Sequence, residues 1–422
     1  MNDKILNLYI EVRQKYKKND VSSDELEKKI NDALKKQVIM TEDLLKIDDL
    51  LSCVEYVRVF SDADHRIKIN FSDENLKKHY YFYRAWENSP EVDSLDDEND
   101  EVPASLNWCL PNASLEGLWE SLVLEEGIKK QLMSYVQTIL EYSSRNVNPN
   151  IVHWNGVVLL HGPPGTGKTT LCKGLAQKLS IRLKSKYKTC QLIEINAHSL
   201  FSKWFSESAK LVLKMFTAVK QWLNSKDHFV CILIDEVESL THARKANGLE
   251  PSDSIRVVNA VLTQIDQLQR YPNVLILATS NVTNTIDIAF SDRADLKLLL
   301  AHPSMWAIYK ILSSCIDELI DCKLINGSKS DFFTVDIYKN EYDGNAMTKV
   351  LNNSNFLKDV AQICTGLSGR AVRKIPFLAS AKFANHPIPD LKTFLKAMMD
   401  VSKEYITNDS RYFYTENSIN SH

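Results

Sequence analysis

A glycine-rich segment in the middle of the chain joins an apolar run to an amphipathic one. The segment reads His161-Gly-Pro-Pro-Gly-Thr-Gly-Lys-Thr-Thr170 and follows the apolar residues 157–160. This order predicts a strand, a loop and a helix, with the pattern G-x-x-x-x-G-K-[ST] in the loop. Glycines let consecutive N–H groups point at an anion, and the following helix adds the positive end of its dipole. The segment therefore predicts a phosphate-binding site.

The predicted nucleotide contacts are Gly162, Pro163, Pro164, Gly165, Thr166, Gly167, Lys168, Thr169 and Thr170. Lys168 is expected at the β- and γ-phosphates of ATP, and the Thr169 hydroxyl is expected to be a ligand of Mg²⁺. The alternative is a glycine turn that matches the pattern by chance. The residues, their order and their flanks all favour the nucleotide site.

A second apolar run, residues 229–234, ends in the carboxylates Asp235 and Glu236. Such a run predicts a buried parallel strand whose C-terminal end faces the ligand crevice. There Asp235 would complete the Mg²⁺ shell, and Glu236 would accept the proton of an attacking water. The alternative, a solvated helix cap, does not explain the apolar residues before the acids. The predicted cofactors are thus ATP and Mg²⁺.

Composition limits the function classes that remain. A chain of 422 residues with 44% hydrophobic and 25% charged residues has room for two or three globular domains. A formal net charge of −3 gives no electrostatic reason to expect direct nucleic-acid binding. The 8 cysteines include no C-x-x-C pair, which is typical of reduced thiols. The polar start and the lack of a long apolar stretch predict a protein of the cytosol or nucleus that is neither secreted nor membrane-bound.

Residues 1–90 carry no nucleotide motif and predict a small α+β domain for recognising a substrate or an adaptor. Ser22 begins a helix with one apolar face, and the alternation at residues 67–71 and the aromatic run 80–83 predict strands. We interpret the aromatic run as a core strand, with a binding face as the alternative. Residues 91–106 are predicted to form a flexible acidic linker, because dense like charges repel one another. A docking tail for a basic partner is the alternative.

Strands and amphipathic helices alternate from residue 107 to residue 300. This alternation implies right-handed crossovers and a three-layer α/β core around a parallel sheet. Residues 301–422 show apolar helical patches between polar stretches and predict an all-helical domain. Within it, residues 326–355 are expected to form an exposed insertion, and the last dozen residues are expected to be frayed.

Several segments carry a resemblance to known proteins. The glycine-rich loop, residues 255–266 and residues 278–281 resemble the core of AAA+ ATPases. Residues 196–208, 234–241 and 366–370 resemble, more narrowly, the pachytene checkpoint protein 2 family of meiotic and mitotic remodellers. The match covers about residues 107–385. It implies an AAA+ large domain at 107–300 and a helical lid at 301–422.

The resemblance also implies an activity and partners. Members form homo-hexameric rings that use ATP to unfold part of HORMA-domain proteins, in some cases through a HORMA-type adaptor, and so convert closed forms to open ones. The implied setting is control of the meiotic chromosome axis, the synapsis checkpoint and the spindle assembly checkpoint. The implied location is the nucleus and chromosomes in meiotic cells, and the cytoplasm or kinetochores in mitosis.

Individual residues match positions with roles in the family. Asn281 corresponds to the sensor 1 residue, which orients the attacking water. Arg293 is expected to reach the γ-phosphate of a neighbouring subunit. Many relatives carry two arginines in this stretch and this chain has one, so a surface salt bridge is the alternative for Arg293. Arg370 corresponds to the sensor 2 arginine of the lid, with Arg373 as the second candidate. For both, capping of lid carboxylates is the alternative.

Lys203, Trp204 and Phe205 fall between a core strand and a long helix, where a loop is ordinarily polar. In a ring this position faces the pore, where Trp204 would grip a polypeptide through apolar contact. The alternative is a loop anchor folded into the core. Residues 241–253 are the natural second pore loop.

Two other function classes share these motifs. A clamp-loader or helicase-loader type of ATPase would act on DNA and present a basic groove. A nucleotide-gated scaffold would bind partners in its ATP state and unfold nothing.

Overall fold

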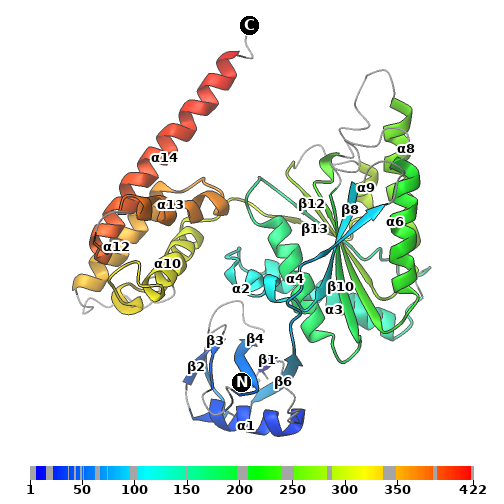
Figure 1. Cartoon of the computed structure of the whole chain (residues 1–422), viewed down its shortest axis with the longest axis horizontal. Coiled ribbons are helices and arrows are strands. Elements are labelled where there is room, and N and C mark those ends of the chain that lie inside the picture. Colours follow the sequence, from blue (N-terminus) through cyan, green and yellow to red (C-terminus); the bar gives the residue numbers. More distant parts are fainter. Residues whose placement is uncertain are drawn as a thin grey trace. The chain divides into compact units, whose positions relative to one another are not determined.

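The fold is known from a computed structural model of the chain (Figure 1). It describes residues 6–15, 22–36, 38–41, 44–47, 50, 52–61, 67–73, 75–95, 102–148, 150–196, 208–239, 251–282, 288–335, 348–383 and 387–419. The chain divides into two compact units. The first comprises residues 1–122, 126–162 and 168–299, and the second comprises residues 123–125, 163–167 and 300–422. In the described ranges, no helix has both the length and the apolar character that crossing a bilayer requires.

The N-terminal part of the first unit is a small α+β domain. Its strands are β1 (Leu6–Gln14), β2 (Val38–Met40), β3 (Leu44–Leu45), β4 (Val54–Ser61), β5 (Lys68–Asn70) and β6 (Leu76–Tyr83), and its helix is α1 (Ser23–Lys35). One sheet has the order β3-β4-β1-β6, and β2 pairs with β5. The helix begins where predicted, because the Ser22 side chain accepts a hydrogen bond from the Glu25 N–H at 3.3 Å. Its apolar face, Leu26, Ile30 and Leu34, is buried in the core of this domain.

The aromatic run 80–83 belongs to β6. Tyr80 and Phe82 pack against the core of this domain, and Tyr83 is buried. The hydroxyls of Tyr56 and Tyr83 lie 3.0 Å apart, which satisfies two buried polar groups with each other. The interpretation of this run as a core strand is confirmed.

The rest of the first unit is built on a seven-stranded sheet in the order β13-β9-β12-β11-β10-β8-β7. The strands are β7 (Glu91–Leu95), β8 (Val102–Leu110), β9 (Val157–His161), β10 (Thr189–Asn196), β11 (His228–Asp235), β12 (Val274–Ser280) and β13 (Leu296–Leu299). The helices are α2 (Leu118–Ser121), α3 (Ile128–Ser144), α4 (Lys168–Arg182), α6 (Ser208–Leu223), α8 (Pro251–Leu268) and α9 (Ile288–Arg293), with a 3₁₀ turn, η2, at Ala113–Leu115. Strands β9 to β13 pair parallel to one another, while β7 and β8 are antiparallel additions.

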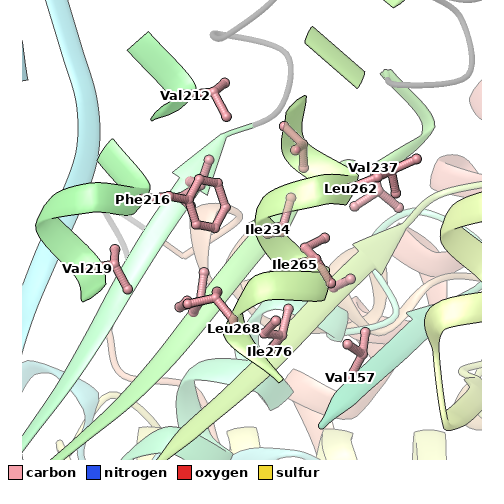
Figure 2. Close-up of a cluster of buried hydrophobic side chains, with 14 of the residues drawn as sticks. Val157, Val212, Phe216, Val219, Ile234, Val237, Leu262, Ile265, Leu268 and Ile276 are labelled. Carbon is pink, nitrogen blue, oxygen red and sulfur yellow. The ribbon is translucent and has the colours of Figure 1, made fainter. Parts of the chain in front are cut away.

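Both faces of β9, β11 and β12 are buried along most of their length, whereas the edge strand β13 exposes Lys297 and Leu299. On one face, Ile234 and Ile276 meet Phe216 of α6 and Ile265 of α8 (Figure 2). The intervening strand residues, which point to the opposite face, are equally buried, and α4 contacts β8, β10, β11 and β12. Because neither face of β9, β11 or β12 meets water, their sequences are continuous apolar runs, and this is why they were visible in the sequence. The predicted α/β fold with a parallel core sheet and a helical C-terminal part is confirmed.

The acidic stretch 91–106 differs from its prediction as a flexible linker. Residues 91–95 form β7, and β8 continues from residue 102 to residue 110 as the neighbour of β10. Strand pairing uses backbone groups, and at the edge of a sheet acidic side chains can stay in water. Glu91, for example, pairs with Asn107 in the ladder and is itself exposed. Charge density therefore did not prevent strand formation here.

Charged side chains connect the N-terminal domain to α2 and α4 within the first unit. Lys178 of α4 donates to Glu11 of β1, and its Nζ lies 2.6 Å from Oε1 of Glu120 in α2. The Lys178 and Glu11 side chains are only 4% and 3% exposed. Arg58 of β4 lies 3.2 Å from Glu120, and Arg182 lies 3.6 Å from Glu11. We call these five residues the α4 cluster.

The second unit is mainly helical, as predicted. Its elements are α10 (Met305–Asp321), η3 (Lys329–Asp331), α12 (Thr348–Ile363), α13 (Gly369–Ala381) and α14 (Leu391–Ile419). The predicted exposed insertion 326–355 is wrong at its C-terminal end, because residues 348–355 begin α12. Ser354 is fully buried there and accepts a hydrogen bond from the Phe333 N–H at 2.9 Å. The expected fraying is also wrong for the backbone, which stays helical to Ile419.

Candidate nucleotide site

The glycine-rich loop joins the end of β9 at His161 to the start of α4 at Lys168, which is the predicted strand, loop and helix. Gly162, Gly165 and Gly167 have φ angles of 142°, 75° and 97°. A residue with a Cβ is strained at such angles, so the turn accounts for all three glycines of the loop. Their freedom gives the loop the tight turn that a phosphate cradle needs.

The remaining loop residues lie along this turn. The Thr166 hydroxyl donates to the Pro163 carbonyl at 3.0 Å, and Thr166 is buried. Pro164 is exposed, and Thr170 lies half-buried in the first turn of α4. The nucleotide contacts of these residues stay a prediction.

Lys168 and Thr169 open α4. Lys168 is 5% exposed, and its Nζ donates to the Gly162 carbonyl at 2.8 Å. The Thr169 hydroxyl lies 2.9 and 3.2 Å from the two carboxylate oxygens of Asp235. A hydroxyl beside one carboxylate suits Mg²⁺, which prefers hard oxygen ligands and retains several waters. Among the described residues, no group of three or more His, Cys, Asp or Glu could hold a metal ion.

Asp235 and Glu236 lie where β11 ends, as predicted. Asp235 is the last residue of the strand, and Glu236 has a φ of 60°, which is uncommon for a residue with a side chain. Both are partly exposed, unlike the buried residues that precede them. Thr279 of β12 contacts both acids, and the sequence reading missed it because a threonine within an apolar run is an ordinary strand residue.

Asn281 directly follows β12, beside the strand that carries the two acids. Its backbone N–H donates to Oε1 of Glu238 at 3.1 Å, and Glu238 is 9% exposed. Glu238 is a second residue that the sequence reading missed. The contact fixes the backbone at Asn281, while the role of its side chain in orienting water stays a prediction.

Arg293 ends α9 and forms a bidentate ion pair with Asp266 of α8. Its Nε lies 2.6 Å from Oδ1 and its Nη2 lies 2.8 Å from Oδ2 of Asp266, while Nη1 donates to the Ala289 carbonyl at 2.6 Å. The salt bridge, which is the alternative to a contact of Arg293 with a neighbouring subunit, is therefore present within the chain. Its side chain remains 27% exposed, so contact with a neighbouring subunit is still a prediction.

Arg370 and Arg373 lie on α13 in the second unit. The helix begins with Ser368 as its cap, whose hydroxyl accepts from the Ala371 N–H at 3.2 Å. The Arg370 backbone N–H donates to the carbonyl of Gly165, which belongs to the same unit, at 3.1 Å. Arg373 donates to the Cys315 sulfur at 4.0 Å. Arg370 thus contacts the glycine-rich loop through its backbone N–H, and its sensor role stays a prediction.

The predicted pore residues Lys203, Trp204 and Phe205 lie outside the described residues, as do residues 241–250 of the second predicted pore loop. Residues 251–253, the end of that loop, instead begin α8.

Two titratable side chains near the loop are uncharged near pH 7. Burial lowers the pKa of His161, and the nearby Lys168 lowers it further, so the imidazole is neutral near pH 7. Burial raises the pKa of the Cys172 thiol on α4, and the Asp235 charge adds to the shift, so this thiol stays protonated. The positive potential of the loop therefore comes from Lys168 and the start of α4.

Family comparisons agree with this geometry. Residues 158–301 match the model of the ATPase family associated with various cellular activities (AAA), and residues 304–406 match the TRIP13-like AAA+ ATPase lid C-terminal domain. The Pachytene checkpoint protein 2 homolog of Xenopus tropicalis is 44% identical over 401 residues, which cover 93% of this chain and 92% of that protein. The homolog of Homo sapiens is 50% identical over 328 residues, 77% of this chain and 75% of that protein.

Solved structures also show similarity to this family. PCH-2 of C. elegans has a TM-score of 0.75 at 34% identity and covers 95% of this chain and 99% of its own. A chain of the E. coli MS115-1 HORMA:CdnC:Trip13 complex has a TM-score of 0.52 at 16% identity over 70% of this chain and 93% of its own, which shows the shared fold alone. With a matching lid, a relative aligned over nearly its whole length and the loop and acids of an ATPase in place, this chain belongs to the pachytene checkpoint protein 2 family of AAA+ ATPases.

Proposed function

We propose that this ATPase unfolds part of HORMA-domain proteins and so converts closed, partner-bound forms to open ones. The observation that carries the proposal is the similarity to a Pachytene checkpoint protein 2 homolog over 401 residues, which extends beyond the ATPase core into the N-terminal domain. The Trip13 structure with the same fold is a complex with a HORMA protein. A shared recognition domain as well as a shared motor favours a shared class of substrate.

The proposed working form is a homo-hexamer with ATP between subunits. Residues 162–170 hold the phosphates, and Arg293 of one subunit reaches the nucleotide of the next. Asp266 holds one edge of the Arg293 guanidinium through two hydrogen bonds, which lowers the conformational freedom that the arginine would lose on contacting a phosphate. Arg370 couples the nucleotide state to the lid.

Thr169 and Asp235 would hold Mg²⁺, which neutralises charge on the phosphates when bound. Glu236 accepts the proton of the attacking water, and Asn281 orients that water. Hydrolysis then drives the pore residues Lys203, Trp204 and Phe205 to pull on a HORMA protein that the N-terminal domain, or an adaptor bound to it, presents. Direct nucleic-acid binding is not part of this proposal, in keeping with a net charge of −3.

The proposed setting is the meiotic chromosome axis, the synapsis checkpoint and the spindle assembly checkpoint. The corresponding locations are the nucleus and chromosomes in meiotic cells and the cytoplasm or kinetochores in mitosis. The names of the relatives support the meiotic part of this assignment.

The test uses a purified HORMA protein whose closed and open forms separate by chromatography. With less than one ring per substrate molecule, the wild-type chain should convert many closed molecules, and Glu236→Gln should bind the substrate without converting it. Binding without conversion by the wild-type chain would indicate a nucleotide-gated scaffold instead. Salt-dependent DNA binding would indicate a loader.

A further inference from the structure

Thr279, near the end of β12, is 2% exposed and contacts both predicted catalytic acids. Its hydroxyl donates to Oδ1 of Asp235 and accepts from the Glu236 N–H at 3.3 Å. Its carbonyl accepts from the Val237 N–H at 2.9 Å. One residue of β12 therefore bonds to three consecutive residues at the end of β11.

The strand register explains this placement. In the parallel pairing of β11 with β12, Ile234 lies opposite Ala278, so the residue after Ala278 falls beside Asp235. A hydroxyl has one proton to donate and two lone pairs to accept with. Thr279 uses the proton on a carboxylate and a lone pair on a backbone N–H, a combination that valine, its isosteric counterpart, cannot provide.

The backbone of Glu236 depends on such contacts. Its φ of 60° costs free energy for a residue with a Cβ and persists only where surrounding bonds hold it. Thr279 bonds to the Glu236 N–H and to the next N–H along the chain. Because the Cα–Cβ direction follows the backbone angles, these bonds also set the direction in which the Glu236 side chain leaves the backbone.

Asp235 is held from two sides. The Thr169 hydroxyl donates to it from α4, and the Thr279 hydroxyl donates to it from β12. A carboxylate with two such donors has a fixed orientation, as ligands of metal ions usually do. Thr169 is a candidate ligand itself, whereas Thr279 acts only through the acids.

We propose that Thr279 is a positioning residue for ATP hydrolysis, which orients Asp235 for the metal and Glu236 for the attacking water. The proposal rests on the roles proposed above for the two acids. It predicts that the loss of one buried hydroxyl slows turnover and weakens the binding of Mg²⁺ without weakening nucleotide binding in the absence of metal.

The experiment compares Thr279→Val and Thr279→Ser in the full-length chain. Thr279→Val should lower kcat about 10- to 100-fold and raise the Mg²⁺ concentration for half-maximal activity, as the loss of partners around metal ligands typically does. Thr279→Ser keeps the hydroxyl and should stay within about 3-fold of wild type on the same scale. The affinity for a fluorescent ATP analogue in EDTA should be the same in all three proteins.

Thr217→Val is the matched control, because it removes the same hydroxyl from an exposed turn of α6, where it donates to the Leu213 carbonyl. It should leave all three measurements unchanged. Should Thr279→Val fail to give a folded protein, Thr279→Cys makes the same test, since a thiol is a weak donor.

Wild-type kcat in Thr279→Val, or an equal loss in Thr279→Ser, would overturn the proposal, because the hydroxyl would then not be the active feature. Glu236→Gln, measured alongside, separates the positioning role of Thr279 from the proton-acceptor role of Glu236. If Glu236→Gln keeps normal turnover, the proposed role of the acid fails whatever the threonine variants do.

Discussion

Lys178 is the central positive charge of the α4 cluster, and Lys178→Met tests how firmly β1 is held on α4. Methionine has a similar length to lysine and no charge. In this variant the Glu11 carboxylate, whose side chain is 3% exposed, would stay buried, and Arg182 at 3.6 Å would be the cation that remains beside it. Burial alone would raise the pKa of Glu120, but Lys178 and Arg58 outweigh it and the pKa is lowered. The variant thus removes a charge that both carboxylates need.

The expected magnitude follows from this burial. Removing one partner of a buried ion pair costs about 3–5 kcal/mol, because the other charge stays buried with less compensation than before. Hydrogen exchange of the full-length chain, read by mass spectrometry on peptides from β1 and the second half of α4, measures this directly. Opening of the contact should become about two to four orders of magnitude more frequent. Adding Glu11→Gln should restore part of the protection, since it removes the stranded carboxylate.

Lys188→Met is the control for this prediction. Lys188 lies 2.6 Å from Asp227, but the two side chains are 82% and 53% exposed. Exposed pairs contribute little to stability, so this variant should leave the protection of β1 as it is in the wild type. Equal protection in the Lys178 and Lys188 variants would refute the reasoning, because burial would then not be what makes the Lys178 pair matter.

Three further variants test the proposed cycle. Glu236→Gln should bind ATP and substrate and lose turnover by at least about 100-fold in a coupled ATPase assay, since it removes the proton acceptor; normal turnover would remove Glu236 from this role. Asp266→Asn should lower turnover by about 10-fold and leave ATP affinity unchanged, because Arg293 loses its bidentate partner; unchanged turnover would show that the pair is a surface feature. Trp204→Ala should hydrolyse ATP and assemble normally but not open a HORMA protein in the chromatographic assay; full remodelling would return Trp204 to the role of a loop anchor.

The sequence was most informative where structure depends on neighbouring residues. The glycines of the loop were recognisable because their backbone angles exclude other residues, and the strand before Asp235 because both of its faces are buried. The start of α1 followed from the Ser22 cap in the same way. Each of these features is determined within a few residues of the chain.

What the sequence did not reveal depends on residues far apart. Thr279 matters because a strand register brings it to Asp235, 44 positions away, and Asp266 matters because α8 and α9 meet. The hairpin of β7 and β8 was hidden because its edge strand carries acids, which resemble a linker in composition. Such features require the tertiary structure, since no local pattern encodes them.

Helix α4 has the glycine-rich loop at one end and the α4 cluster near the other. Ten residues separate Lys168 from Lys178, a rise of about 15 Å along a helix too short to bend much. A shift of its first turn on phosphate binding would therefore move the whole helix as a rigid body, and with it β1, which carries Glu11. We expect nucleotide binding to affect the N-terminal domain through this helix. One end of α4 would then respond to the nucleotide, and the other end would contact the domain proposed to bind the substrate.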